Sequence, residues 1–255
     1  MRYAALLLLA AVAGCAAPQN ATTAAAGSPG ERIVDAALSA GTPDVAIRVS
    51  SGLLAQDPKN VGLLMRQANA YIMTGNRAAA ADDYRRVLTI QPGLETAELG
   101  LGKLLIATDP HGAQVVYQGI LARQPRNAEA LSNLGVALDL QGQHDAAQKS
   151  YREALVITPN AVPVRQNLGL SLAVSGNPEE AVQILGQLAR EGDNDRRVRD
   201  NLAMALALTG RTDEADKMLR EELSPADAEK ALAAYSQLAA NTAPAAGPAI
   251  GPVTQ

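Results

Sequence analysis

The chain has 255 residues and a formal net charge of −4, with 22 Lys and Arg against 26 Asp and Glu. Because this balance offers no basic surface, it excludes a protein that holds nucleic acid through its phosphates. The chain contains one cysteine, no Trp and no Phe, and 47% of its residues are hydrophobic. The lone cysteine excludes an intrachain disulfide, and the composition favours helices packed through small residues over a β-sandwich.

Residues 1–14 predict an export signal. Arg2 supplies a positive start, residues 4–13 form an apolar stretch, and small residues precede Cys15. This stretch is too short to cross a bilayer, which takes about 20 residues. The segment Val12-Ala13-Gly14-Cys15 resembles the lipobox of bacterial lipoproteins. The resemblance implies cleavage before Cys15 and acylation of that residue, with palmitate among the possible chains. An ordinary secretory signal with a chance cysteine is the alternative.

A repeat of 34 residues organises the chain after a flexible linker at residues 15–26. Four prolines recur at intervals of 34, 33 and 34 residues: Pro58, Pro92, Pro125 and Pro159. An alanine precedes each by twelve residues, and the alanine series continues beyond them: Ala46, Ala80, Ala113, Ala147, Ala181 and Ala215. Glycines keep the same phase: Gly41, Gly75, Gly142, Gly176 and Gly210. One block carries Asp109-Pro110 instead and is one residue shorter.

Each block predicts two amphipathic helices joined by a tight turn. In residues 128–161, apolar side chains follow helical spacing on both sides of Gly142, which turns the chain. The small residues Gly135 and Ala147 allow the two helices to approach closely. Tyr151 is expected to fill the space that they leave.

This pattern resembles the tetratricopeptide repeat, a helix-turn-helix unit of 34 residues. The resemblance implies an all-α, right-handed superhelical solenoid at residues 27–240. The expected units are six repeats and a capping helix: 27–60, 61–94, 95–127, 128–161, 162–195, 196–229 and 225–240. The first repeat is expected to be degenerate, because Ser28-Pro29-Gly30 stands where a helix should begin. Residues 241–255 are expected to be disordered. A helical bundle without repeats is the alternative fold.

Residues suited to catalysis are scarce, so the sequence predicts a non-enzymatic protein without metal or cofactor. His111 and His144 lie in predicted turns, lack a second ligand at metal-binding spacing, and are expected to be solvated. The segment Gly100-Leu101-Gly102-Lys103 lacks the first glycine of a phosphate loop and lies inside a predicted helix. Asp82-Asp83 and Glu179-Glu180 are adjacent pairs, expected to be solvated helix faces. A hydrolase is the remote alternative.

A concave groove is the remaining candidate site. In the tetratricopeptide repeat family the first helix of each unit lines this groove. By resemblance, five apolar residues form a strip along it that would suit an amphipathic helix or an extended apolar peptide: Ile72, Ile106, Val136, Leu170 and Met204. Ordinary packing between helices is the alternative for each.

Three asparagines share one phase of the repeat: Asn133, Asn167 and Asn201. An asparagine carries a donor and an acceptor and can therefore bond a peptide backbone whatever its side chains. Related repeats use such an asparagine ladder, although asparagine is also simply frequent there in the family. Lys103 and Arg197 are too scattered to predict a clamp for a peptide carboxylate.

The lipobox, the six repeats and the length resemble the TadD lipoproteins of tight-adherence (Flp) pilus assembly, most closely at residues 164–173 and 199–207. The resemblance implies an adaptor that binds a protein or peptide segment, such as an outer-membrane secretin, and no nucleic acid. It would be lipid-anchored in the bacterial outer membrane, facing the periplasm. Lipoproteins are retained in the inner membrane mainly by an Asp directly after the cysteine, and here that position is Ala16. A pilotin-like protein, or a scaffold for type IV pili or cell-wall synthesis, is the alternative.

Overall fold

The computed structural model describes residues 28–192 and 195–242, and every regular element within these residues is a helix. The helices, in chain order, are α1 (Pro29–Ser39), α2 (Pro43–Leu54), α3 (Val61–Met73), α4 (Arg77–Ile90), α5 (Glu95–Leu105), α6 (Pro110–Arg123), α7 (Ala128–Asp139), α8 (His144–Ile157), α9 (Val162–Val174), α10 (Pro178–Arg190), α11 (Arg196–Leu208), α12 (Thr212–Arg220) and α13 (Pro225–Thr242). The predicted all-α fold class is confirmed.

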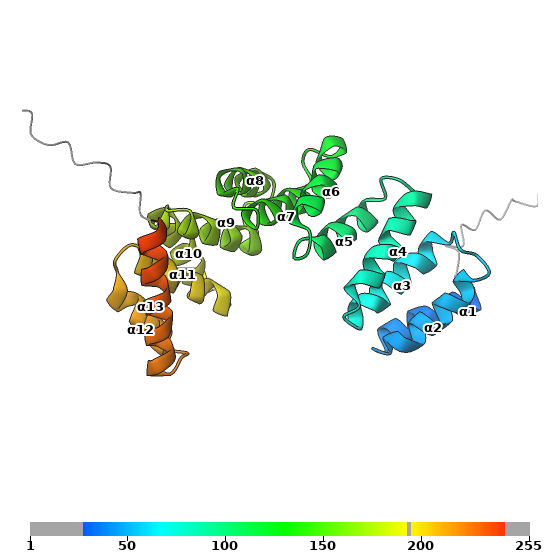
Figure 1. Cartoon of the computed structure of the whole chain (residues 1–255), viewed down its shortest axis with the longest axis horizontal. Coiled ribbons are helices and arrows are strands. Elements are labelled where there is room, and N and C mark those ends of the chain that lie inside the picture. Colours follow the sequence, from blue (N-terminus) through cyan, green and yellow to red (C-terminus); the bar gives the residue numbers. More distant parts are fainter. Residues whose placement is uncertain (1–27, 193–194, 243–255) are drawn as a thin grey trace, which may run out of the picture.

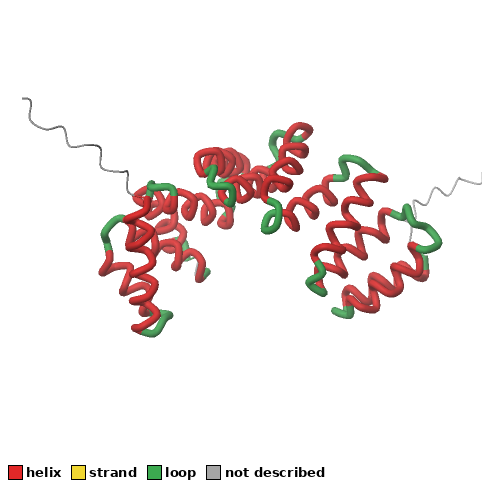
Figure 2. The backbone as a smooth tube through the Cα atoms, viewed as in Figure 1, coloured by secondary structure: helices red, strands yellow, loops and turns green. Residues whose placement is uncertain are grey.

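Successive helix pairs form an arch. Each predicted repeat block holds one pair, from α1 and α2 to α11 and α12, and each helix packs against the next. Figure 1 shows α1–α4 and α10–α13 as two arms that extend to the same side of a bridge formed by α5–α9. The connections between the helices are short (Figure 2). None of the helices in the described residues is both long and apolar enough to cross a membrane.

The two helices of a repeat are joined by different turns in different repeats. Gly142 adopts a φ of 72°, a left-handed conformation that side chains with a Cβ disfavour. The third repeat lacks this glycine and uses Asp109, whose carboxylate accepts a hydrogen bond from the backbone N of Gly112 at 2.9 Å. Pro110 follows as the first residue of α6, where a missing N–H costs nothing.

The expectation of a degenerate start to the first repeat was wrong. Ser28 caps α1, because its hydroxyl accepts a hydrogen bond from the N of Glu31 at 3.2 Å. The Glu31 carboxylate in turn accepts from the N of Ser28 at 3.0 Å. Ser-Pro at this point therefore begins a helix through a capping box, with Pro29 at its first position. The predicted boundary between the capping helix (225–240) and the tail (241–255) also differs slightly from the structure. Helix α13 runs to Thr242 and so includes the first residues of the predicted tail.

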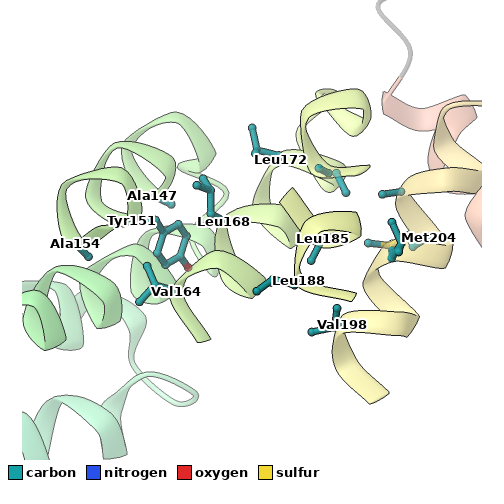
Figure 3. Close-up of a cluster of buried hydrophobic side chains, with 14 of the residues drawn as sticks. Ala147, Tyr151, Ala154, Val164, Leu168, Leu172, Leu185, Leu188, Val198 and Met204 are labelled. Atoms are coloured by element: carbon teal, nitrogen blue, oxygen red, sulfur yellow. The ribbon is translucent and has the colours of Figure 1, made fainter. Parts of the chain in front are cut away.

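The core depends on small residues that face large ones. A Cβ added to Gly135 would lie 2.5 Å from the ring of Tyr151. Ala147 and Tyr151 are almost fully buried, and Figure 3 shows them beside Val164 and Leu168 of α9. The predicted role of Gly135 and Ala147 in close helix approach, with Tyr151 between the helices, is confirmed.

Candidate peptide-binding site

An open cavity of about 560 Å³ is lined by residues of α3, α4, α5 and α7. This volume lies within the range of known ligand sites, about 300–1,000 Å³. Its apolar lining includes Ile72 of α3 and both Leu99 and Leu104 of α5, while Tyr84 of α4 lines it with a largely buried ring. The second and third repeats therefore provide a ready-made recess for an apolar side chain.

Gly100 packs tightly against Tyr84 in the wall of this recess. A Cβ at Gly100 would lie 2.5 Å from the Tyr84 ring, so only glycine permits α5 to approach α4 this closely. The predicted helical location of Gly100 is confirmed, since α5 spans Glu95–Leu105 and no phosphate loop forms. The backbone amides here are used within the helix, and the segment contributes shape to the cavity.

Charged side chains complete the cavity lining. The Lys103 ammonium lies 2.5 Å from the Glu129 carboxylate, and both side chains are about half exposed. Such an exposed ion pair contributes only about 0–1 kcal/mol to stability. Arg77, the first residue of α4, also lines the cavity. The sequence predicted neither Arg77 nor Glu129 as part of a site, because they come from different repeats than Lys103.

The predicted apolar strip is only partly a surface. Ile72 is 41% exposed and Leu170 is 38% exposed, while Ile106 and Val136 are half-buried among packed helices. Met204 belongs to the core and is 9% exposed (Figure 3). The placement of Met204 in a groove was wrong, because α9 and α13 both pack directly on α11, which carries it. Of the five residues, Ile72 lines the cavity.

The three in-phase asparagines have side chains without a hydrogen-bond partner in the described chain. Asn133, Asn167 and Asn201 are half-buried, and within the described chain none of their side chains makes a hydrogen bond. The Nδ2 of Asn133 is buried without an acceptor, and such an unmet donor costs about 1–3 kcal/mol. The ladder remains a prediction, and these side chains have the unused hydrogen-bonding capacity that it needs.

A polar cluster around Asp139 was not foreseen. The Asp139 carboxylate accepts hydrogen bonds from the hydroxyls of Tyr151 at 2.9 Å and Ser171 at 2.7 Å. The Nδ1 of His144 lies 2.9 Å from the same carboxylate. Burial and the Asp139 charge both raise the pKa of Tyr151, because each disfavours the phenolate. His144 therefore joins α8 to α7, and its expected solvation holds only in part, because the side chain is 31% exposed and contacts Asp139.

Asp83 is not on a solvated helix face, contrary to the prediction for the pair Asp82-Asp83. Its side chain is buried, with one carboxylate oxygen 3.0 Å from Arg86 and the other without a partner. Burial raises the pKa of Asp83, and Arg86 offsets this only in part. Its neighbour Asp82 is exposed and pairs with Arg85, as the prediction of a solvated face requires. Glu179 and Glu180 are exposed as expected.

Cys15, the signal at residues 1–14 and the linker at residues 15–26 lie outside the described residues, as do residues 243–255 of the predicted tail. Among the residues that are described, no three His, Cys, Asp or Glu side chains lie close enough together to hold a metal ion.

Comparison with known proteins identifies the repeats. Family models described as tetratricopeptide repeat match residues 31–95 and 104–162, residues 140–200, and residues 196–221. Together they cover more than half of the chain. Over 92 residues, the chain is 32% identical to the tetratricopeptide repeat and J domain-containing co-chaperone DNJ1 of Fusarium oxysporum f. sp. lycopersici. That match covers 36% of this chain and only 18% of the co-chaperone.

Solved structures show the same fold. The crystal structure of MamA protein is 25% identical, with a TM-score of 0.58 over 65% of this chain and 93% of that chain. A tetratricopeptide repeat protein from Parabacteroides merdae ATCC 43184 reaches a TM-score of 0.69 at 16% identity, over 86% of this chain and 94% of that chain. The phase of the repeats, the stacked helix pairs and these matches agree: the chain belongs to the tetratricopeptide repeat family.

Proposed function

We propose that this protein is a lipid-anchored adaptor that helps a tight-adherence (Flp) pilus machine assemble at the bacterial outer membrane. Tetratricopeptide repeat proteins are generally non-catalytic scaffolds that bind protein or peptide partners. The adaptor role rests on the open cavity between the second and third repeats, which is suited to a protruding side chain of a partner. The pilus role rests on the lipobox and on the resemblance of the repeats to the TadD lipoproteins.

In this proposal the lipid anchor attaches the protein to the membrane, and the repeats bind the partner. Acyl chains on Cys15 hold the protein to the inner leaflet, since each buried methylene contributes about 0.8 kcal/mol and two or more chains give stable anchoring. The repeats then face the periplasm and bind an extended segment of an assembly component such as the secretin. In this arrangement Asn133, Asn167 and Asn201 bond the backbone of the segment, and neighbouring apolar residues receive its side chains.

Crosslinking in intact membranes, followed by identification of the captured proteins, tests this proposal. The wild-type protein should carry a lipid label, fractionate with the outer membrane and crosslink to pilus assembly components. Cys15→Ser should lose the lipid label and membrane retention. Changing Asn133, Asn167 and Asn201 together to Ala should preserve membrane retention and weaken crosslinking. Gln183→Ala, on an exposed part of α10, serves as the matched control and should behave as the wild type.

Two results would overturn the proposal. If Cys15→Ser fractionated with the membrane as the wild type does, while neither protein carried lipid, the anchor would be refuted. If the membrane-bound wild type captured another envelope machine and no pilus component, the pilus role would be refuted and the general scaffold would replace it.

A further inference from the structure

Three tyrosines occupy the same position in consecutive repeats but differ in the hydrogen-bond partners of their hydroxyls: Tyr84, Tyr117 and Tyr151. Tyr151 in the fourth repeat donates its hydroxyl hydrogen to Asp139, at 2.9 Å. The second and third repeats carry Ile72 and Ile106 at the place of Asp139. Consequently, within the described residues, the hydroxyls of Tyr84 and Tyr117 have no hydrogen-bond partner.

The two unpartnered hydroxyls differ in access. Tyr117 is fully buried, and its hydroxyl is sealed in the core. Tyr84 is 7% exposed and lines the cavity of about 560 Å³. Unlike the hydroxyl of Tyr117, the hydroxyl of Tyr84 is not fully buried, so solvent can reach it. Tyr84 thus offers a hydroxyl donor that a ligand in the cavity can reach.

The sequence phase sets how α5 packs against Tyr84 at this repeat. Gly100 stands where the next three repeats carry Asn133, Asn167 and Asn201. At Gly100 the α5 backbone lies directly against the Tyr84 ring, since even a Cβ would come within 2.5 Å of it. The series of asparagines therefore stops at the third repeat, where Gly100 and Tyr84 together line the cavity.

The charges around the recess select the ligand. Its lining carries two cations, Arg77 and Lys103, and one carboxylate, Glu129. Lys103 is paired with Glu129, whereas Arg77 makes no ion pair with any described residue. A ligand carboxylate would balance this excess positive charge and accept from Tyr84. The apolar lining by Ile72 and Leu99 would then contact an apolar side chain next to it.

We propose that this cavity binds an acidic peptide segment in which an Asp or Glu lies beside an apolar residue. The peptide carboxylate accepts a hydrogen bond from the Tyr84 hydroxyl and faces Arg77. It thereby takes the place at Tyr84 that the Asp139 carboxylate has at Tyr151 in the fourth repeat. The inference rests on the adaptor role proposed above and adds the chemistry of the partner and the place where it binds.

A peptide library tests this inference with the full-length chain. Immobilised octapeptides with blocked ends are screened, and the best binder is titrated by fluorescence anisotropy. The enriched peptides should pair Asp or Glu with an aliphatic or aromatic neighbour. Tyr84→Phe should weaken the best peptide about tenfold, since hydrogen bonds to charged groups are among the stronger ones. Tyr117→Phe, which removes the equivalent but sealed hydroxyl, is the matched control and should bind as the wild type.

A double-mutant cycle separates the specific contact from a general loss. Replacing the peptide Glu by Gln should weaken binding to the wild type, and it should have a smaller effect with Tyr84→Phe, where only the attraction to Arg77 remains to be lost. Arg77→Gln, an exposed change at the cavity, should also weaken the acidic peptide and reduce the dependence of its affinity on salt. The absence of enriched peptides, enrichment without acidic residues, or wild-type affinity in Tyr84→Phe would overturn the inference.

This assay needs no membrane and no pilus component, so its outcome is separable from that of the crosslinking experiment. Acidic peptides that bind through Tyr84, with no pilus component captured in membranes, would refute the pilus role alone. Pilus components captured equally by the wild type and Tyr84→Phe, together with the failed library screen, would refute the acidic-peptide site alone.

Discussion

A glycine facing a large side chain recurs where two helices of this chain come closest. A Cβ would lie 2.6 Å from Tyr117 at Gly102, 2.5 Å from Tyr151 at Gly135 and 2.6 Å from Leu185 at Gly169. These distances are too short for real contacts, and the facing rings and branched side chains are buried. Close packing of the repeats therefore requires glycine, whose side chain is a single hydrogen atom, at these positions.

Gly135→Ala should consequently destabilise the fold by about 1–3 kcal/mol, the usual cost of overpacking. Gly119→Ala is the matched control, because a Cβ at that position in α6 meets nothing within 4 Å. The control should stabilise the helix by about 0.5–1 kcal/mol, since glycine is a poor helix former. Urea unfolding followed by circular dichroism measures both changes. An unfolding midpoint for Gly135→Ala at or above that of Gly119→Ala would contradict the packing argument.

Asp83 predicts a pH dependence of stability. Because burial raises its pKa above the ordinary value of 3.8, the folded state holds this proton more tightly than the unfolded state does. Its contribution to stability is therefore largest below the unfolded pKa and falls as the pH rises through the raised folded pKa. Asp83→Asn removes this term, so its melting temperature relative to the wild type should rise as the pH increases from below 3.8 through the raised folded pKa. A constant difference across that range would show that Arg86 fully compensates the buried charge.

At the scale of the helices, local chemistry made most of the fold predictable. The phase of Ala147 and Tyr151 predicted which faces touch, because small and large residues alternate at helical spacing. The same phase predicted where the turns lie. Ser28-Pro29 was misjudged because the two residues were interpreted as breaking a helix, although serine and proline are favoured at a helix start.

The site was less predictable, because it depends on how successive repeats sit on one another. Arg77 and Glu129 lie far apart in sequence and line one cavity only through the stacking of α3, α4, α5 and α7. Met204 has the spacing of a groove residue, but the direct packing of α11 against α9 and α13 places it in the core. A repeat phase defines each helix face, while the curvature of the stack decides whether that face is open.

At the scale of the whole molecule, the buried residues of the part that the structure describes form two clusters that adjoin at the third repeat. One extends from Val34 to Leu104 and the other from Ala113 to Ala228, with Leu105 and Val116 packed against both. In a solenoid each repeat contacts mainly its neighbours, so stability is close to a sum of repeat and interface terms. An end of such a stack needs a cover for its apolar face, and α13 packs against α11 and α12 at this end.

Removal of α13 should therefore loosen the last repeat as well as the helix itself. Ala228 of α13 is fully buried, and Leu232 and Tyr235 pack against the cluster that contains Leu219. Each large apolar side chain that truncation after residue 224 exposes costs about 1.5–3 kcal/mol, and the last repeat is then left with one neighbour only. Hydrogen exchange should show α11 and α12 opening, and light scattering should show association through the exposed face. Truncation after residue 242 keeps α13 whole and serves as the control, with exchange and mass per particle as in the full chain. Equal protection of α11 and α12 in the two truncations would mean that the sixth repeat closes the solenoid without α13.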